Sequence, residues 1–338
     1  MTLASLQERL AQLVREFASC RVTVVGDLVA DQFLYGEISR VSREAPVLIL
    51  RHERTETVPG GAANCAANLA ALGAQTALVG VVGADMSGRS LLERLSALGV
   101  DCRGVVSADE HVTATKVRIL AGQAHAPRQQ VIRVDYEGTP LADAGIKAQL
   151  AERLRPACAT ADVVIISDYN YGVACAEVIE SVRACVHERA LPVLVDSRFR
   201  LLEFAGFTSA TPNEDEVEHV LGRRLADTAT LDEAATELCA RLDFDALLIT
   251  RGPNGILLLE RDRAPLHIAA VGSREAVDVT GAGDTVIATY ALALARGASF
   301  ADAANLANYA GGLVVMKRGT ATVTAQELLA SVLENDER

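Results

Sequence analysis

The stretch from Asp278 to Thr285, Asp-Val-Thr-Gly-Ala-Gly-Asp-Thr, combines glycines with acids immediately before an apolar, helix-forming run. Gly281 and Gly283 allow a tight backbone turn at the helix start. The free N–H groups of a first helical turn, together with the helix dipole, attract anions. Asp284 would then lie beside a bound phosphate, where a carboxylate can accept a proton from an attacking hydroxyl. The alternative is a glycine turn with a capping aspartate and no chemistry.

A second glycine motif, Pro59-Gly-Gly-Ala-Ala-Asn-Cys-Ala66, opens a helical pattern that runs to Leu72. Gly60 and Gly61 allow the backbone to approach a ligand closely, and Asn64 carries both a donor and an acceptor for hydroxyl groups. A Gly-Gly turn ahead of an alanine-rich packing helix explains the motif equally well. The sequence has neither GxxxxGK[ST] nor GxGxxG, so phosphate is expected at residues 278–285.

The bulk properties exclude several classes of protein. The 338 residues have a formal net charge of -12 without a basic run, which argues against nucleic acid as the main partner. No apolar run approaches the roughly 20 residues that span a bilayer, and residues 1–20 have the pattern of an amphipathic helix. Seven cysteines without a CxxC pair indicate reduced thiols and a cytoplasmic protein.

Short apolar runs alternate with helical patterns, which predicts one α/β domain over residues 1–338, with three layers and a mainly parallel sheet. The runs are continuous rather than alternating, as in strands covered on both faces. Strands are expected at Arg21–Gly26, Ala77–Gly83, Asp162–Ser167, Pro192–Asp196, Ala246–Thr250 and Gly255–Leu259. Helices are expected at Ala62–Leu72, Ser87–Leu98, Ala174–Arg189, Asn213–Leu221, Asp232–Leu242, Gly283–Arg296 and Phe300–Met316.

Three stretches, at 45–58, 111–120 and 129–135, interrupt the alternation of strands and helices, because their period-two patterns indicate extended chain. Such period-two patterns are typical of a small antiparallel sheet with one polar face. We expect a lid built from insertions at about 32–58 and 111–136.

Polar residues lie at the ends of several predicted strands: Asp27 and Asp168 follow two of them, Asp196 ends a third, and Thr250-Arg251-Gly252 ends a fourth. In open parallel sheets, ligands bind outside the carboxyl ends of the strands. One such aspartate is usually a cap or a turn residue, but several on the same sheet edge favour a binding site.

The two glycine motifs, in this order and separation, resemble the signatures of the ribokinase-like (PfkB) carbohydrate kinases, and the resemblance extends from about Arg21 to Val323. It implies an α/β/α fold with a β lid, ATP as co-substrate, Mg²⁺, and a monovalent cation as a further candidate. It also implies a homodimer formed through the lid sheets. Asp284 would be the catalytic base, and the N–H groups of Gly281, Ala282 and Gly283 would form an anion hole.

The same resemblance assigns further residues to the two substrates. Asn213 and Glu216 would organise Mg²⁺ through water around the ATP phosphates. The nucleotide-side loops of the family are matched by Thr250, Gly252 and Gly255, and Asn308 would lie near the adenine. The sugar would be held by Asp27, Asp31, Gly60, Gly61, Asn64 and Asp168.

A narrower resemblance is to the heptose kinases of lipopolysaccharide precursor synthesis, which phosphorylate C1 of D-glycero-β-D-manno-heptose 7-phosphate on the route to ADP-heptose. It rests on Val25–Asp31, Ser39–Pro46, Ser167-Asp-Tyr169, Gly172 and Gly319-Thr320. In many bacteria this kinase is fused to an adenylyltransferase. Because the chain lacks the HxGH motif, a stand-alone kinase is expected.

The phosphate of such a substrate needs cations, and the candidates are Arg133, Lys116, Arg118 and Arg198. Arg133 is preferred because it lies between apolar neighbours on a lid strand, although a solvated surface charge is the alternative for each. Arg198 follows Asp196-Ser197, where similar enzymes have Asp-Pro-Lys; an arginine can also bind phosphate. Two rival functions remain: a related kinase for another sugar or a nucleoside, and a sugar-phosphate-binding regulator without catalysis.

Overall fold

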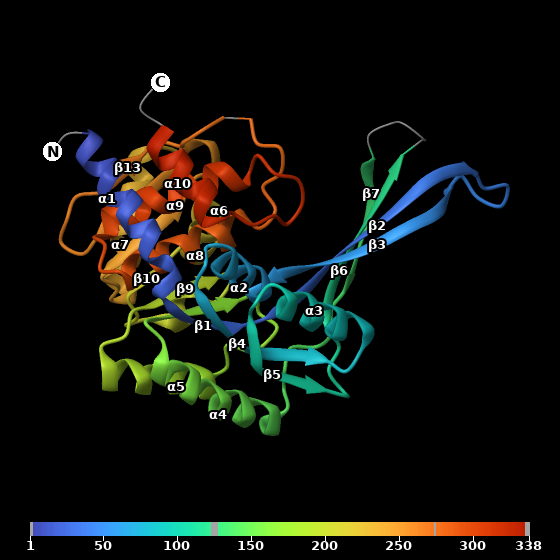
Figure 1. Cartoon of the computed structure of the whole chain (residues 1–338), viewed down its shortest axis with the longest axis horizontal. Helices are drawn as coiled ribbons and strands as arrows, with labels where there is room; N and C mark the ends of the chain where they lie inside the picture. Colours follow the sequence, from blue (N-terminus) through green and yellow to red (C-terminus); the bar gives the residue numbers. More distant parts are fainter. Residues whose placement is uncertain (1–2, 123–127, 274, 335–338) are drawn as a thin grey trace.

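The protein is described by a computed structural model that covers residues 3–122, 128–273 and 275–334. A nine-stranded sheet has the order β13-β12-β11-β10-β9-β8-β1-β4-β5 (Figure 1). Neighbouring strands are parallel except for β11–β12 and β12–β13. The strands are β1 (Arg21–Gly26), β4 (Gln75–Gly83), β5 (Asp101–Ala108), β8 (Val163–Asp168), β9 (Val193–Ser197), β10 (Ser209–Ala210), β11 (Ala246–Thr250), β12 (Ile256–Glu260) and β13 (Leu266–Ile268).

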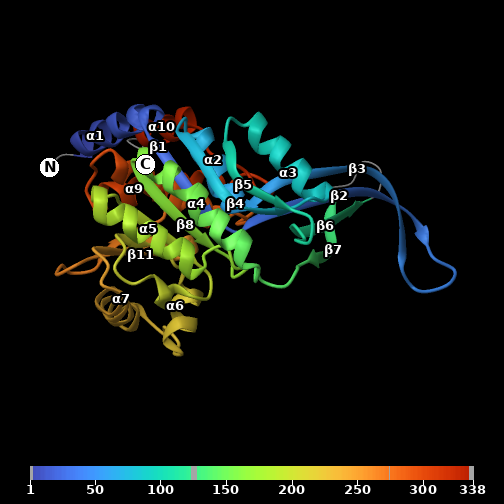
Figure 2. The same ribbon diagram turned by 90° about the horizontal axis from the view of Figure 1, so that it is seen from below.

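Helices cover both faces of this sheet (Figure 2). One face carries α1 (Leu3–Glu16), α2 (Ala62–Ala71), α3 (Met86–Ala97), α8 (Ala282–Ala295), α9 (Phe300–Val314) and α10 (Ala325–Glu334). The other carries α4 (Ala144–Thr160), α5 (Ala176–Arg189), α6 (Glu214–Leu221) and α7 (Thr228–Leu242). The predicted three-layer arrangement and mainly parallel sheet are therefore confirmed.

The buried strands explain why their sequences are continuously apolar. Along β8, Val163 and Ile165 pack into the core with α8, whereas Val164 and Ile166 pack into the core with α5. Successive side chains of a strand point to opposite faces, so a strand between two helical layers needs apolar residues at every position.

The six strands predicted for the main sheet and the seven helices predicted with them are all present, and their bounds differ by at most two residues, except that α7 begins four residues before Asp232. The predicted helix at 1–20 is α1 followed by a 3-10 turn at Phe17–Ser19, and Met1 and Thr2 lie outside the described residues. Two further 3-10 turns lie at Leu201–Phe204 and Gly252–Asn254. No helix in the described part of the chain is long and apolar enough to cross a membrane.

The lid is a four-stranded sheet, β3-β2-β6-β7, that extends away from the main sheet (Figure 1). Its strands are β2 (Leu28–Val41), β3 (Leu48–Gly61), β6 (Ala114–Gly122) and β7 (Gln129–Tyr136). Residues 123–127 of the predicted second insertion lie outside the described residues. The lid starts at Leu28 rather than near residue 32, because only Asp27 separates the end of β1 from the start of β2.

The prediction that the lid is antiparallel was wrong for its central pair, since β2 and β6 are parallel. β2 follows β1 and β6 follows β5, and these two main-sheet strands run in the same direction. Both lid strands therefore leave the carboxyl edge of the main sheet in parallel. This places the lid above the strand ends where polar residues were predicted to gather.

Candidate active site

Asp284 lies in the first turn of α8, in a cavity between the lid and the carboxyl ends of the main strands, and only 4% of its surface is exposed. Its Oδ2 accepts a hydrogen bond from Nδ2 of Asn64 at 2.7 Å, and its Oδ1 accepts one from the Tyr169 hydroxyl at 3.2 Å. Burial raises the pKa of the Asp284 carboxyl to about 7, although both hydrogen bonds oppose the rise. Such a carboxyl is suited to accept a proton near neutral pH.

The two glycines at the start of α8 meet different surroundings. Gly281 caps the helix with a φ of 76°, and a Cβ there would lie 2.5 Å from Nδ2 of Asn64. At Gly283 no atom beyond its chain neighbours and the backbone of its own helix lies within 4 Å of a Cβ position, so space is open beside the helix start.

Backbone hydrogen bonding also separates these positions. Within the described residues, the N–H groups of Gly281 and Gly283 have no acceptor, whereas that of Ala282 donates to the carbonyl oxygen of Val279 at 3.2 Å. The two glycine amides are open to an anion. An anion at the Ala282 amide would have to compete with this hydrogen bond or share its N–H.

Two cavities meet at this helix start, and they share Thr250, Val279, Ala282 and Gly283. The first lies between β12, α8 and α9, and the second lies under the lid beside Asp284. A phosphoryl donor in the first and an acceptor hydroxyl in the second would face each other at Gly283.

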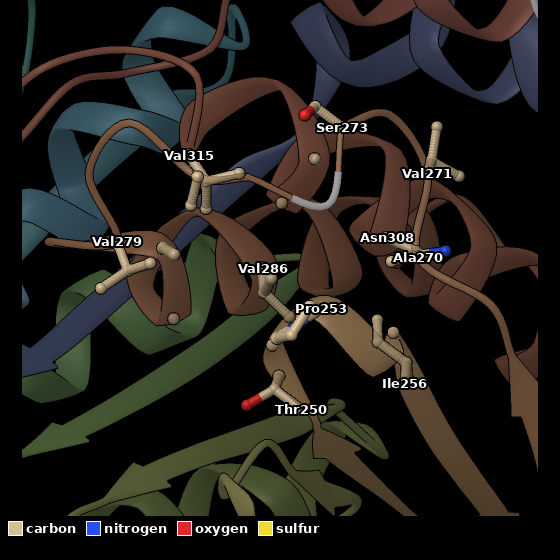
Figure 3. Close-up of a pocket in the computed structure, with 17 residues that line it drawn as sticks. Thr250, Pro253, Ile256, Ala270, Val271, Ser273, Val279, Val286, Asn308 and Val315 are labelled. Atoms are coloured by element: carbon tan, nitrogen blue, oxygen red, sulfur yellow. The ribbon is translucent and has the colours of Figure 1, made fainter.

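The first cavity has largely apolar walls, to which Ile256, Val271, Val286 and Val315 contribute (Figure 3). Apolar walls with a few polar groups suit a flat heterocyclic base. The four predicted nucleotide residues, Thr250, Gly252, Gly255 and Asn308, all line it.

Two of these residues hold the 268–270 segment that forms one wall of the cavity. Nδ2 of Asn308 donates to the carbonyl oxygen of Ala269 at 2.6 Å. At Gly255, φ is 87° and a Cβ would lie 2.1 Å from the carbonyl oxygen of Ile268, so the backbones can approach only because the residue is glycine.

Asn213 and Glu216 form a reciprocal cap at the start of α6 and line the second cavity. Oδ1 of Asn213 accepts from the N–H of Glu216 at 2.8 Å, and Oε2 of Glu216 accepts from the N–H of Asn213 at 2.9 Å. Burial raises the pKa of the Glu216 carboxyl, which would favour a cation beside it.

The described residues contain no group of three or more His, Cys, Asp or Glu side chains arranged for a metal ion. This donor set fits Mg²⁺ better than a metal caged by protein, because Mg²⁺ keeps several waters and takes one or two carboxylates beside substrate phosphates. Asn213 and Glu216 would hold such an ion indirectly.

The position of Asp27 does not fit its predicted role as a sugar ligand. Its buried carboxylate accepts hydrogen bonds from the backbone N–H groups of Tyr169, Tyr171 and Val173 at 2.8, 3.0 and 3.0 Å, and it does not line the cavity of Asp284. Burial raises the pKa of the Asp27 carboxyl to about 6, which these amides partly offset. Asp27 therefore shapes the loop after β8.

The position of Asn64 also does not fit its predicted contact with the sugar. Its Nδ2 donates to Asp284, its Oδ1 accepts from Nδ2 of Asn68 at 3.3 Å, and it does not line the cavity. The Thr285 hydroxyl donates to Oδ1 of Asn68 at 2.9 Å. Asn64 is thus a positioning residue for Asp284, held from α2.

The remaining predicted sugar residues do line the cavity. Asp31 forms an ion pair with Arg118 of the lid, and a Cβ on Gly60 would lie 2.6 Å from Oδ2 of Asp31. Asp168 accepts hydrogen bonds from the Ser197 hydroxyl at 2.7 Å and from Arg200 at 3.3 Å.

Arg133 and Arg198 both line this cavity, but their partners differ. Arg133 forms an ion pair with Asp135 at 2.9 Å. Arg198 has no ion pair within the described ranges.

Asp196 and Thr211 line the cavity but were not assigned a role from the sequence. Burial raises the pKa of the Asp196 carboxyl well above its usual range, and the negative charges of Glu216, Asp284 and Asp168 raise it further. The buried Thr211 hydroxyl has no hydrogen-bond partner in the described part of the chain. A signal for Asp196 was present, since it ends a predicted strand and Asp168 follows another.

The chain matches the model of the pfkB family of carbohydrate kinases over residues 20–327. It is 41% identical over 310 residues to the Bifunctional protein HldE of Geobacter metallireducens, covering 91% of this chain and 62% of that protein. The Bifunctional protein HldE of Pseudomonas aeruginosa is 43% identical over 319 residues, covering 94% of this chain and 64% of that protein. The chain thus spans less than two thirds of the length of these relatives.

Solved structures confirm the ribokinase-like fold. The structure of Arabidopsis thaliana ribokinase complexed with ribose and ATP has a TM-score of 0.70 at 22% identity, covering 93% of this chain and 98% of that one. Escherichia coli phosphofructokinase-2 in complex with substrates and products has a TM-score of 0.73 at 19% identity, covering 92% and 98%. Since the family match extends over nearly the whole chain and includes the loop that carries Asp284, the chain belongs to the pfkB family of carbohydrate kinases.

Proposed function

We propose that this carbohydrate kinase transfers the γ-phosphoryl group of ATP to the C1 hydroxyl of D-glycero-β-D-manno-heptose 7-phosphate, which gives the 1,7-bisphosphate for ADP-heptose and lipopolysaccharide synthesis. The observation that carries the proposal is the buried Asp284 at the junction of an apolar and a polar cavity. The choice of heptose is supported by the resemblance of residues 25–31, 39–46 and 319–320 to heptose kinases.

In this mechanism, Asp284 accepts the proton of the C1 hydroxyl as its oxygen bonds to the γ-phosphorus. The bond from that phosphorus to the β–γ bridging oxygen breaks, and ADP leaves. The amides of Gly281 and Gly283 donate to the transferring phosphoryl oxygens. Asn64 and Tyr169 hold the Asp284 carboxylate toward the cavity.

The other predicted residues divide between the substrates. Asp31, Gly60, Gly61 and Asp168 line the place of the sugar, and Thr250, Gly252, Gly255 and Asn308 line that of the nucleotide. Mg²⁺, when bound with ATP near Asn213 and Glu216, supplies neutralisation of phosphate charge. A monovalent cation remains a prediction, which comparison of K⁺ with Na⁺ in the same assay tests.

We further propose that the enzyme acts in the cytoplasm, where ATP is supplied, and that it forms a homodimer through its lid sheets. The dimer is supported by the exposed apolar side chains Ile132 and Val134 on the edge strand β7. The stand-alone arrangement of the kinase stays a prediction.

The test is a coupled assay of ATP consumption with a panel of acceptors: heptose 7-phosphate, fructose phosphates, ribose and adenosine. Heptose 7-phosphate should give the highest kcat/KM. A higher value with another acceptor would reject the heptose assignment. No ATP consumption with any acceptor would favour a non-catalytic regulator.

A further inference from the structure

The lid face above Asp284 carries an amino group, that of Lys116, which forms no ion pair with the carboxylates beside it. Side chains alternate along strands, and this face carries Asp31, Lys116, Arg118, Arg133 and Asp135. Asp31 pairs with Arg118, and Arg133 pairs with Asp135. Lys116 has no ion pair among the residues that the structure describes.

Arg198 brings a second unpaired cation to the same cavity from the loop after β9. Its N–H donates to the carbonyl oxygen of Asp168 at 3.1 Å, which fixes the loop. Its guanidinium lies 5.8 Å from the ring centroid of Phe199 and has no hydrogen-bond acceptor within residues 3–122, 128–273 and 275–334.

Lys116 and Arg198 are close enough to repel each other. Burial lowers the pKa of the Lys116 ammonium, and the positive charge of Arg198 lowers it further, while Asp31, Asp135 and Glu137 oppose the change. Nζ of Lys116 lies 5.9 Å from the ring centroid of Tyr169, whose hydroxyl donates to Asp284. Lys116 therefore reaches the acceptor cavity beside Tyr169, and Arg198 lines the same cavity.

We propose that Lys116 and Arg198 together bind the phosphate group of a phosphorylated acceptor sugar. A phosphate dianion would neutralise both cations and accept hydrogen bonds from each, which offsets the repulsion between the two charges and the cost of partly burying Lys116. Neither residue lines the cavity assigned to the nucleotide. The inference rests on the proposed sugar kinase function. It assigns the phosphate to Lys116 and Arg198 instead of Arg133, because the guanidinium of Arg133 is paired with Asp135.

The experiment measures kcat/KM for matched pairs of acceptors with and without the phosphate: heptose 7-phosphate with heptose, and fructose 6-phosphate with fructose. The variants are Lys116→Met, Arg198→Gln and Arg133→Gln. Arg51→Gln is the matched control, because Arg51 is an exposed lid arginine, 3.6 Å from Glu37, that does not line the cavity. Thermal unfolding checks that each variant folds.

In Lys116→Met and Arg198→Gln, the preference for the phosphorylated acceptor should fall about tenfold to a hundredfold, through KM, as expected for lost hydrogen bonds to a charged group. KM for ATP should change less than about twofold, and Arg133→Gln should have a smaller effect than either. An unchanged preference would overturn the proposal. So would a rise in KM for ATP alone, which would assign the pair to the γ-phosphate.

These outcomes are separable from failure of the proposed function. If the wild-type enzyme prefers another phosphorylated sugar, the heptose assignment fails. The loss of phosphate preference in the two variants would still support the subsite for that sugar.

Discussion

Asp284 meets two requirements of a general base at the residue scale. Its two oxygens are held by different donors, Asn64 and Tyr169, so its orientation is fixed. Its burial raises its pKa to about 7, so the ionised form is a stronger base than an ordinary aspartate.

Replacing Asp284 by Asn should lower kcat by a factor of about 10² to 10⁴, the usual contribution of a general base. The asparagine can still accept from Asn64 and donate to the Tyr169 oxygen, so the fold should persist. KM for ATP should stay within about twofold and the thermal unfolding midpoint should not fall. An Asn variant with near wild-type kcat would remove Asp284 from the mechanism.

The pH dependence of kcat/KM should show the ionisation of Asp284. Because the base must be deprotonated, activity should be lost as pH falls through about 7 and level off above it. The acceptor phosphate also titrates near pH 6, so a control is needed. In Asn64→Ala, loss of the donor that stabilises the carboxylate should move the acid limb to higher pH. An acid limb at the same pH in both enzymes would contradict the assignment.

The sequence identified the residues that lie together at the start of α8 as a group, but it could not assign every partner. Asp284, Gly281 and Gly283 lie within one motif. Asp27 contacts Tyr169, which is 142 positions away in the sequence, and Asn64 contacts Asp284, which is 220 positions away. No local sequence pattern indicates such distant contacts. The choice between Arg133 and Lys116 likewise required knowing that Asp135 pairs with Arg133.

At the scale of elements, α2 and α8 position the base through a buried polar chain. Thr285 donates to Asn68, Asn68 donates to Asn64, and Asn64 donates to Asp284. A satisfied polar network of this kind fixes the relative register of two helices. The two glycine motifs are therefore coupled, since each one opens one of these helices.

The glycines at the start of α8 should respond differently to alanine. Gly281→Ala should lower the free energy of unfolding by about 1–2 kcal/mol and also reduce kcat, because φ is 76° and the new methyl would push on Asn64. Gly283→Ala should leave stability equal or higher, since its surroundings are open and alanine favours helix. It should nevertheless reduce kcat by obstructing the transferring phosphoryl group.

Thermal unfolding and steady-state kinetics on both variants check this contrast. Equal activity of Gly283→Ala and the wild type would argue against phosphate binding at that amide.

Element prediction failed where local signals were weak or were overlooked. Helix α4 contains Gly145 and Pro156, both poor helix formers, yet it forms because Leu150, Leu154 and Cys158 bury one face. For α10 a signal existed: Thr324 caps Glu327 reciprocally, and Leu328 and Val332 are spaced as a buried stripe. The strands β5, β10 and β13 were not predicted, and β10 and β13 are only two and three residues long.

At the scale of the whole molecule, the lid and the main sheet together enclose the cavity that we propose for the acceptor. The carboxyl ends of the main strands provide Asp168 and Asp196, and the lid provides Asp31, Lys116 and Arg118. The three-layer fold followed from the alternation of apolar runs and helical patterns. The parallel pairing of β2 with β6 could not be read from the period-two pattern, which both kinds of sheet share.

The outer face of the lid should mediate a homodimer. Ile132 is 53% exposed on β7, and a charge there would be buried against a second copy. Ile132→Lys should therefore be monomeric at concentrations where the wild type is dimeric, as measured by analytical ultracentrifugation. Leu333→Lys on α10 is the control, because Leu333 is an exposed apolar residue remote from the lid. A monomeric wild type, or a dimeric Ile132→Lys variant, would reject the lid interface.

The central claim is phosphoryl transfer to C1 by a site built around Asp284. The most direct measurement is phosphorus and proton NMR of the product formed from ATP and D-glycero-β-D-manno-heptose 7-phosphate. The expected result is a new phosphorus signal coupled to the proton on C1, with the C7 phosphate retained, and no such signal with Asp284→Asn over the same time. A phosphate on any other carbon, or the same product at the wild-type rate from Asp284→Asn, would contradict the claim.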